Sequence, residues 1–372
     1  MKGLIIWAHS TCRSTIHLYD QIAKLGEFPV KIALWHHAGY NGENARASTG
    51  FVANECGNLP LLPIGNDYQN GVRLLDEHSG WNHLIGQYQA SATFRRICVQ
   101  ACHRGEHVGI ISEAPCNMET GLRRVLKAIH MRTLLPLKIR NVVRCADFIV
   151  NLSGDSSKTL KLVGWADEKI IPFGYFLPPI EGSRVVVRRT NHPLEILYTG
   201  VMSRYRGADV LMRALILLKE WGVPFQATFT QQGELLAWLK KMTIAHDLPV
   251  DFPGLVPLGD LIKAYETCSV FVGPGPDEPW AMRVNDAVQC GAPLVISSGT
   301  GASKLVDRYG CGCVFARNDY VELANKLKLL AEDEGYYRRC VQSAAKTASE
   351  IGPKKMARKL IDEIRSRVKG WD

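Results

Sequence analysis

Short, uniformly apolar runs recur along the chain and alternate with segments long enough to form helices. Strands that are apolar on both faces are typical of parallel sheets covered by helices on both sides. The sequence therefore predicts an α/β protein built of doubly wound, Rossmann-like domains with parallel sheets. The expected strands are residues 3–8, 30–36, 107–112, 146–153 and 168–173, then 194–200, 225–230, 268–273, 292–297 and 311–316.

The strands fall into two series, separated by a charged, non-periodic stretch with three prolines at residues 178–193. At about 150 residues per domain, a chain of 372 residues also suggests two domains. We expect an N-terminal domain at 1–182, a second domain at 183–350, and a C-terminal amphipathic helix within 351–372 that packs back on one of them. Two such domains leave a central cleft between the carboxyl ends of their strands, where ligands usually bind.

Composition limits the cellular compartment and the classes of partner expected for the protein. The chain has no run of 18 apolar residues, so we expect no transmembrane helix, and its N-terminus reads as a strand rather than a signal peptide. Its 11 cysteines show no metal-ligand spacing, which favours a reduced, cytoplasmic chain without a metal site. The net charge of +9 fits an anionic partner, and charge alone does not choose among nucleic acid, anionic lipid and a phosphorylated substrate.

Two common cofactor motifs are missing. The residues after the first strand, 9–15, contain no glycine, and a Rossmann dinucleotide fingerprint needs a glycine triad there. Gly299 and Gly301 follow a later strand, but no acidic ribose partner accompanies them, and the chain has no Walker loop. A nicotinamide dehydrogenase and a P-loop enzyme are therefore disfavoured.

The stretch 277–293, DEPWAMRVNDAVQCGAP, places two carboxylates eight residues apart. We expect Pro279 to lie in an early helical turn and the helix to continue from about Ala281. Eight helical residues span about 12 Å, so Glu278 would stand at the helix mouth and Asp286 two turns deeper. Carboxylates accept hydrogen bonds from sugar hydroxyls, and a helix N-terminus attracts anionic oxygens. A diphosphate that joins two hydroxyl-rich groups would suit this arrangement.

A diphosphate also needs cations. The loop after the strand at 194–200 carries Arg204 and Arg206. Guanidinium groups bind phosphate oxygens through paired hydrogen bonds, whereas the plainer interpretation of this loop is a solvated turn. Together with Glu278, the two arginines favour a phosphate-binding site.

Five segments of the second half, between about 194 and 335, follow the motif order of a known family. These segments resemble the retaining glycosyltransferases of family 4, which have the GT-B fold. The carboxylate pair matches the family's Glu-x7-Glu signature, and the arginine loop matches its Gly-Arg-Leu-x-x-x-Lys-Gly. The segments are Gly200 to Gly207, Val250 to Gly254 with Leu261 and Tyr265, Glu278 to Asp286, Pro293 to Gly301, and Gly310 to Phe315.

The chain departs from the family pattern at four places. The arginine of Gly-Arg-Leu is Val201, so we expect Arg204 to supply the missing cation. The second carboxylate is Asp286, one methylene shorter, and the usual glycine after the aromatic residue is Ala281. The glycine pair of the first loop is replaced by Ser10 and Thr11.

The resemblance implies a metal-independent glycosyltransferase that moves a sugar from a UDP- or GDP-linked donor to a glycan or lipid-linked glycan with retention of configuration. It further implies bacterial polysaccharide or lipopolysaccharide synthesis. Glu278 would contact hydroxyls of the donor sugar, Asp286 the ribose, and Arg204 with Arg206 the diphosphate. The other implied donor-side residues are Gly200, Gly233, Gly254, Pro257, Trp280, Ala281 and Met282, with backbone N–H groups of 280–282 assisting.

The acceptor side is expected in the first half. Ser10, Thr11 and Arg13 follow the first strand, and Glu113 follows a later one, where it could orient the acceptor hydroxyl. The basic segment 121–144 is either an ordinary amphipathic helix with a solvated face or a peripheral docking site for an anionic membrane surface.

Other functions stay open at this point. A nucleotide-sugar epimerase would convert the donor without any acceptor, and a phosphorylase would need a pyridoxal lysine, to which no motif points. The presence of Glu278 and the paired arginines disfavours an inactive GT-B subunit. A nucleic-acid-binding protein fits the net charge, but the basic residues are spread over many segments and form no known RNA-binding module. We therefore expect no nucleic-acid partner.

Overall fold

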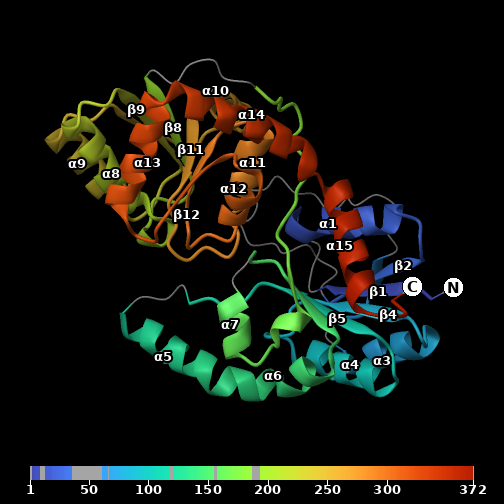
Figure 1. Cartoon of the computed structure of the whole chain (residues 1–372). Helices are drawn as coiled ribbons and strands as arrows, with labels where there is room; N and C mark the ends of the chain where they lie inside the picture. The colour runs from blue at the N-terminus through green and yellow to red at the C-terminus, as the bar shows by residue number, and fades with distance from the viewer. Residues whose placement is uncertain are drawn as a thin grey trace. The chain divides into compact units, whose positions relative to one another are not determined.

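A computed structural model gives the structure of the chain for residues 2–8, 13–35, 61–65, 67–117, 121–154, 157–186 and 193–371. The chain divides into two compact units. Unit 1 comprises Met1–Leu177 and Pro353–Asp372, and unit 2 comprises Pro178–Gly352. In each unit, helices cover both faces of a parallel sheet (Figure 1). None of the described helices is long and apolar enough to cross a membrane.

Unit 1 has a seven-stranded parallel sheet in the order β3-β2-β1-β4-β5-β6-β7. Its strands are β1 (Leu4–Ala8), β2 (Val30–Leu34), β3 (Leu61–Pro63), β4 (Asn82–Ile85), β5 (Val108–Ser112), β6 (Phe148–Asn151) and β7 (Ile170–Pro172). Its helices are α1 (Arg13–Lys24), α3 (Tyr68–Glu77), α4 (Ala92–His103), α5 (Gly121–Arg132), α6 (Leu134–Cys145), α7 (Ser157–Leu162) and α15 (Pro353–Arg367).

The apolar-run criterion missed β3 and β4 in unit 1 and the strand Val250–Gly254 in unit 2. β3 has only three residues, and β4 begins with two polar residues, Asn82 and His83, that are nevertheless buried. The ring of His83 is satisfied inside the core, because its Nδ1 lies 3.2 Å from Nε1 of Trp7 and its Nε2 lies 2.9 Å from the carboxylate of Glu106. A buried polar pair of this kind breaks the apolar pattern without breaking the strand.

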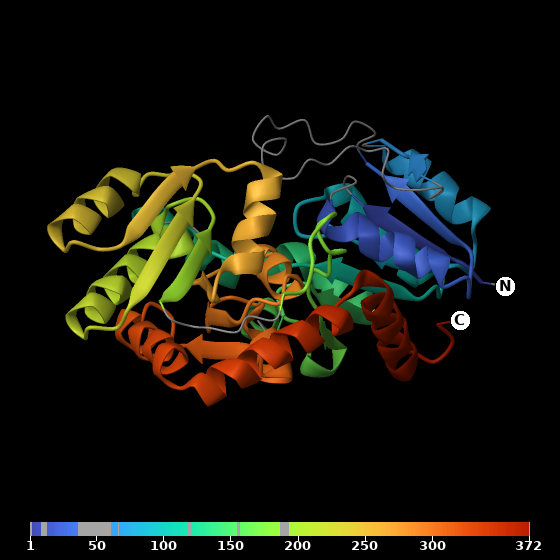
Figure 2. The same cartoon turned by 90° about the horizontal axis from the view of Figure 1, so that it is seen from above.

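Helix α15 returns the end of the chain to unit 1. It packs against α1, and Figure 2 shows the two helices side by side. Arg358 and Arg365 both form ion pairs with Glu27, which follows α1. The side chains that α15 buries are Met356, Ala357, Leu360, Ile361 and Ile364.

Unit 2 has a six-stranded parallel sheet in the order β10-β9-β8-β11-β12-β13. Its strands are β8 (Leu194–Thr199), β9 (Phe225–Thr230), β10 (Val250–Gly254), β11 (Val270–Gly273), β12 (Leu294–Ser297) and β13 (Gly312–Phe315). Its helices are α8 (Ala208–Glu220), α9 (Leu236–Ala245), α10 (Leu258–Thr267), α11 (Arg283–Gln289), α12 (Ser303–Tyr309), α13 (Tyr320–Glu332) and α14 (Glu334–Glu350), with a short 3-10 turn, η3, at Arg204–Arg206.

Both sheets change direction in the same way. In unit 1 the chain builds outward from β1 to β3 and then crosses to β4 on the other side of β1. In unit 2 it builds outward from β8 to β10 and then crosses to β11 on the other side of β8. Loops that leave neighbouring strands in opposite directions open a crevice at the strands' carboxyl ends, so each unit has a natural ligand position.

We expect the return of α15 to stabilise unit 1. Leu360→Ala should lower the free energy of unfolding by about 2–5 kcal/mol, because a fully buried leucine is replaced by a cavity. Lys354→Ala, at an exposed position of the same helix, should change it by less than about 0.5 kcal/mol. Urea unfolding followed by circular dichroism measures both. Equal effects of the two substitutions would contradict a packed α15.

Candidate functional site

The loops after β8 and β11 meet at the switch point of unit 2. Gly207 makes this contact possible: its φ is 71°, and a Cβ there would lie 2.2 Å from the carbonyl oxygen of Pro274. Gly275 is equally constrained, since its Cβ would lie 2.1 Å from Oε1 of Glu278. The two glycines therefore let η3 approach the loop that carries Glu278.

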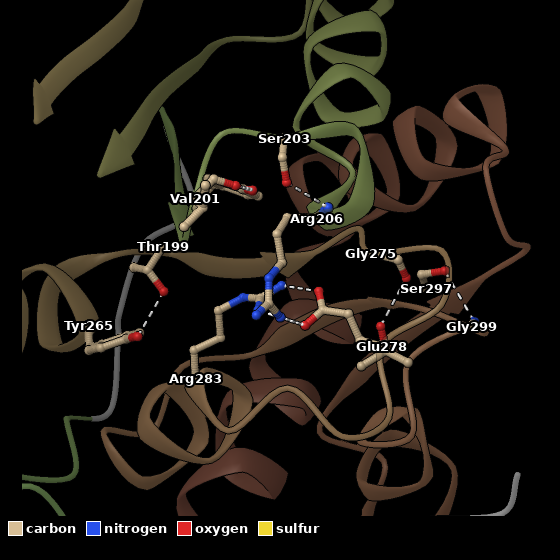
Figure 3. A network of polar contacts seen from close by, with 12 residues as sticks. Thr199, Val201, Ser203, Arg206, Tyr265, Gly275, Glu278, Arg283, Ser297 and Gly299 are labelled. Carbon is tan, nitrogen blue, oxygen red and sulfur yellow. Dashed lines mark hydrogen bonds and ion pairs between the residues drawn. The ribbon is translucent and has the colours of Figure 1, made fainter. Parts of the chain in front are cut away.

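A buried carboxylate and two guanidinium groups form the centre of this site (Figure 3). Arg206 donates through Nη1 to Oε2 of Glu278. Arg283 donates through Nη1 to the same oxygen at 2.8 Å and through Nη2 to Oε1. The side chain of Glu278 is 0% exposed, that of Arg283 12% and that of Arg206 33%. The buried carboxylate thus holds one arginine inside and presents the other partly to solvent.

The charges of the cluster reinforce each other. Burial alone would raise the pKa of Glu278, but Arg283 and then Arg206 hold that pKa below its usual range. Burial disfavours the charge of Arg283, yet Glu278 raises the pKa of Arg283 above its ordinary value. Glu278 and Arg283 therefore stay ionised near neutral pH. Two positive charges against one negative charge leave a net positive site, which suits an anionic ligand.

Arg283 is a residue that sequence reasoning missed. It lies at the start of α11, and its guanidinium fills the space beside Gly200, where a Cβ would lie 3.7 Å from Nε. That space adjoins Val201, where the family motif has an arginine. Nε of Arg283 is buried and has no hydrogen-bond partner within the described structure. Because the family motif has an arginine where this chain has Val201, the sequence did indicate that another cation occupies this space.

Arg204, expected to supply that cation, is placed differently. It is an exposed residue at the first position of η3, and the ion pairs of Glu278 are made by Arg206 and Arg283. The structure therefore brings together Glu278 and Arg206 of the expected set but not Arg204.

The helix expected from about Ala281 is present but begins two residues later, and the expectation that Pro279 lies in an early helical turn was wrong. Helix α11 begins at Arg283, and Glu278 instead forms a parallel bridge with Thr300. The amides of Gly301 and Ala302 donate to the carbonyls of Glu278 and Trp280 at 3.0 and 3.1 Å, which keeps this segment out of the helix. Glu278 thus lies on an extended loop, not at a helix mouth two turns from Asp286.

The residues between Glu278 and α11 take their own positions. Trp280 is buried, and its Nε1 donates to Oδ1 of Asn285 at 2.9 Å, so its indole belongs to the core. Ala281 has a φ of 70°, which is strained for a residue with a Cβ and explains why glycine is usual there. Met282 is partly exposed, and Asp286 is half-buried close enough to raise the pKa of buried Tyr265.

The remaining donor-side residues lie at carboxyl ends of strands in unit 2. Gly200 directly follows β8, and Gly233 follows β9, packed so closely that its Cβ would lie 2.4 Å from the carbonyl oxygen of Met202. Gly254 ends β10 with a φ of 77°, and Pro257 precedes α10. These residues border the same edge of the sheet as Glu278, but the last two lie toward the outer strand.

Unit 1 has a pocket of about 580 Å³ at its own switch point. Ala8 at the end of β1, Gly86 after β4, and Glu113 after β5 line it. Oε1 of Glu113 accepts a hydrogen bond from the hydroxyl of Tyr175 at 2.9 Å. Lys127 and Lys138 reach the pocket from α5 and α6, so both signs of charge face its interior.

Three acceptor-side expectations have no side-chain description. Ser10 and Thr11 lie outside the described residues. The backbone of Arg13 begins α1, but its side chain is likewise outside the described part. Of the expected acceptor residues, Glu113 alone is placed, and it lines the pocket.

Comparison with known proteins shows what this site is similar to. Residues 181–347 match the family model described as glycosyl transferases group 1. This part of the chain is thus similar to the group 1 glycosyltransferases. The matched residues include η3, Glu278 and α11, so the cluster lies inside the matched region.

Two curated relatives share part of their length with the chain. A GDP-mannose-dependent alpha-(1-6)-phosphatidylinositol dimannoside mannosyltransferase of Mycobacterium tuberculosis is 24% identical over 205 residues, which are 54% of this chain and 53% of the relative. The amylovoran biosynthesis glycosyltransferase AmsK of Erwinia amylovora is 26% identical over 187 residues, 48% of this chain and 46% of the relative. The chain spans about half the length of the curated relatives it matches.

A solved structure of similar fold covers nearly the whole chain. Anabaena HepE in complex with UDP superposes with a TM-score of 0.67 at 15% identity, over 98% of this chain and 100% of HepE. At this identity the likeness shows the fold alone. The chain therefore has the GT-B fold that its sequence predicts.

The lowered pKa of Glu278 gives the site a defined pH dependence. The ion-pair cluster contributes stability above the unfolded pKa, which is about 4.3, and loses it as pH falls through the lower folded pKa. Glu278→Gln cannot titrate there. The wild type should therefore be the more stable protein at neutral pH, and its advantage in the free energy of unfolding should shrink as the pH falls below about 5. Urea unfolding at several pH values measures this difference, and a difference independent of pH would contradict the ionised cluster.

Proposed function

We propose that this protein is a glycosyltransferase that uses a UDP- or GDP-linked sugar as donor and a glycan or lipid-linked glycan as acceptor. In the reaction, the bond between the anomeric carbon and the phosphate oxygen breaks. The acceptor oxygen bonds to that carbon, and its proton is released. The observation that carries the proposal is the Glu278–Arg206–Arg283 cluster at the switch point of unit 2, inside the region that matches the group 1 model. Retention of configuration and independence from metal ions belong to the same proposal.

Arg206 and Arg283 are the proposed partners of the donor diphosphate. A guanidinium group can bind two phosphate oxygens at once, and Arg206 is partly exposed while Arg283 has an unsatisfied Nε. Negative charge grows on the diphosphate as the sugar leaves, so preorganised positive charge stabilises the transition state more than the ground state. Glu278 holds both guanidinium groups in place before the donor arrives, and it stays close enough to meet hydroxyls of the donor sugar. Asp286 is the proposed ribose partner.

The pocket of unit 1 is the proposed acceptor site. Its volume suits a sugar, and Glu113 offers a carboxylate with one oxygen already oriented by Tyr175. We propose that Glu113 orients the attacking hydroxyl. Lys127 and Lys138 would face an anionic group next to the acceptor sugar, as in a lipid-linked phosphate.

The surface of α5 and α6 favours an acceptor held at a membrane. These helices follow one another along one edge of unit 1 (Figure 1). They expose six large apolar side chains: Leu122, Val125, Leu126, Ile129, Leu134 and Leu137. Exposed basic residues flank them: Arg123, Arg124, Arg132, Lys138 and Arg140. Apolar residues beside positive charges fit the interface of an anionic bilayer, so we propose that this surface, the α5–α6 surface, docks there peripherally.

The relatives agree with a polysaccharide or glycolipid role. One is named for a mannosyltransferase acting on a phosphatidylinositol dimannoside, and the other for amylovoran biosynthesis. HepE was solved with UDP bound. An epimerase remains the alternative, and it differs by converting the nucleotide sugar without any acceptor.

The donor site is tested by titrating the protein with UDP and GDP in a calorimeter. One of the two nucleotides should bind, and Arg206→Ala and Arg283→Ala should each weaken it about 10- to 100-fold, because each removes hydrogen bonds to a charged group. Arg213→Ala on the exposed face of α8 is the matched control and should bind normally. Circular dichroism checks that each variant is folded.

Two outcomes would contradict the donor site. If neither UDP nor GDP binds at millimolar concentration, the glycosyltransferase proposal is overturned. If nucleotide binding is lost in Arg204→Ala but not in Arg283→Ala, the second phosphate-binding cation is Arg204 and not Arg283.

The α5–α6 surface is tested by sedimentation with lipid vesicles. The protein should bind phosphatidylglycerol vesicles more than phosphatidylcholine vesicles, and salt should weaken the binding. The double variant Leu126→Glu, Leu137→Glu should lose most of it, because each charge would enter the apolar layer. Ile244→Glu, an exposed apolar position of α9 in unit 2, is the control and should leave binding unchanged. Equal sedimentation of the wild type, the double variant and Ile244→Glu would contradict the membrane proposal.

A further inference from the structure

Three cysteine thiols meet in unit 1. The sulfur atoms of Cys98, Cys102 and Cys145 all lie within 4.8 Å of one another. Cys145 ends α6 just before β6 begins, so this cluster lies near the amino ends of the strands, whereas the pocket with Glu113 opens at their carboxyl ends. The proposed transfer reaction uses none of the three thiols.

Helix geometry explains why the thiols converge. Cys98 and Cys102 are four residues apart on α4 and therefore share one face of that helix. Helix α4 packs against α6, which brings Cys145 to the same face. Cys98 is buried, and the other two are half-buried, so an ion can reach the cluster from solvent. The sequence analysis looked for metal ligands at short spacing along the chain. It could not detect three thiols brought together by two helices that pack on each other.

We propose that Cys98, Cys102 and Cys145 bind one thiophilic metal ion, with Zn²⁺ as the probe ion. Thiolates are the ligands that Zn²⁺ and Cu⁺ prefer over harder cations. Sulfur binds Zn²⁺ at about 2.3 Å, so two sulfurs on one tetrahedral ion lie about 3.8 Å apart. The three sulfurs lie within 4.8 Å of one another, so side-chain rotations that bring them about 1 Å closer would let them share an ion.

Among the described residues the cluster offers three ligand atoms, so water would take the fourth coordination position of a bound ion. Oδ2 of Asp147 is engaged by the amide of Val108 at 2.9 Å and the ring of His107 at 3.2 Å. Three thiolates with one exchangeable position form a site that binds an ion without a dedicated fourth side chain.

A bound ion would join α4 to the end of α6. Because the unfolded chain lacks the site, binding would stabilise unit 1 by mass action. The proposed role is therefore structural, and it is independent of the donor and acceptor sites.

The experiment titrates the reduced, chelator-treated full chain with Zn²⁺ against a chromogenic chelator. We expect one tightly bound ion per chain. The double variant Cys102→Ser, Cys145→Ser should weaken binding by more than about 100-fold, because changes one shell further out already cost 10- to 100-fold. Cys116→Ser, a half-buried thiol of unit 1 outside the cluster, should bind like the wild type.

Co²⁺ provides a second readout of the same site. Its complex with the wild type should show sulfur-to-metal charge-transfer absorption that the double variant lacks. Circular dichroism confirms that the double variant is folded, and serine at the two half-buried positions keeps the side-chain size. No Zn²⁺ binding by the wild type would overturn the proposal, as would equal binding by the double variant, which would place the ion at other residues.

Discussion

The carboxylate of Glu278, buried between two guanidinium groups, is the interaction on which the proposed donor site depends. A buried carboxylate without partners is costly, and so is a buried arginine. Arg283 is almost wholly buried and Arg206 is not, so one pairing anchors the cluster and the other presents charge to solvent. Removing Glu278 would leave two like charges facing each other at short range.

The backbone around this cluster is built to allow it. Gly207 and Gly275 permit two loops to approach more closely than residues with a Cβ would allow. The bridge between Glu278 and Thr300 fixes the extended segment before α11. The sheet order of unit 2 places this cluster, since the chain leaves the neighbouring strands β8 and β11 toward opposite sides of the sheet. The same reversal in unit 1 positions the pocket with Glu113, so one topological rule accounts for both candidate sites.

Much of this architecture could be predicted from the sequence. Uniformly apolar strands such as those around Ile196 and Val295 identify parallel sheets, and the motif order identifies the GT-B fold. The strand at 82–85 was missed because His83 is buried and forms hydrogen bonds with Trp7 and Glu106, which no local sequence pattern reveals.

The site was only partly predictable, for a similar reason. Glu278 and Arg206 could be found from their spacing, but the helix was expected too early because Pro279 suits a first turn as well as an extended loop. Arg283 was missed because its role depends on the space beside Gly200, which is a tertiary property. The thiol cluster likewise depends on the packing of α4 on α6 and not on spacing along the chain.

The most direct test of this account is a crystal structure of the protein with a bound nucleoside diphosphate. The account expects phosphate oxygens within hydrogen-bonding distance of both Arg206 and Arg283, with the nucleoside along the carboxyl ends of the strands in unit 2. A diphosphate bound through Arg204 without Arg283, or bound away from Glu278, would contradict it.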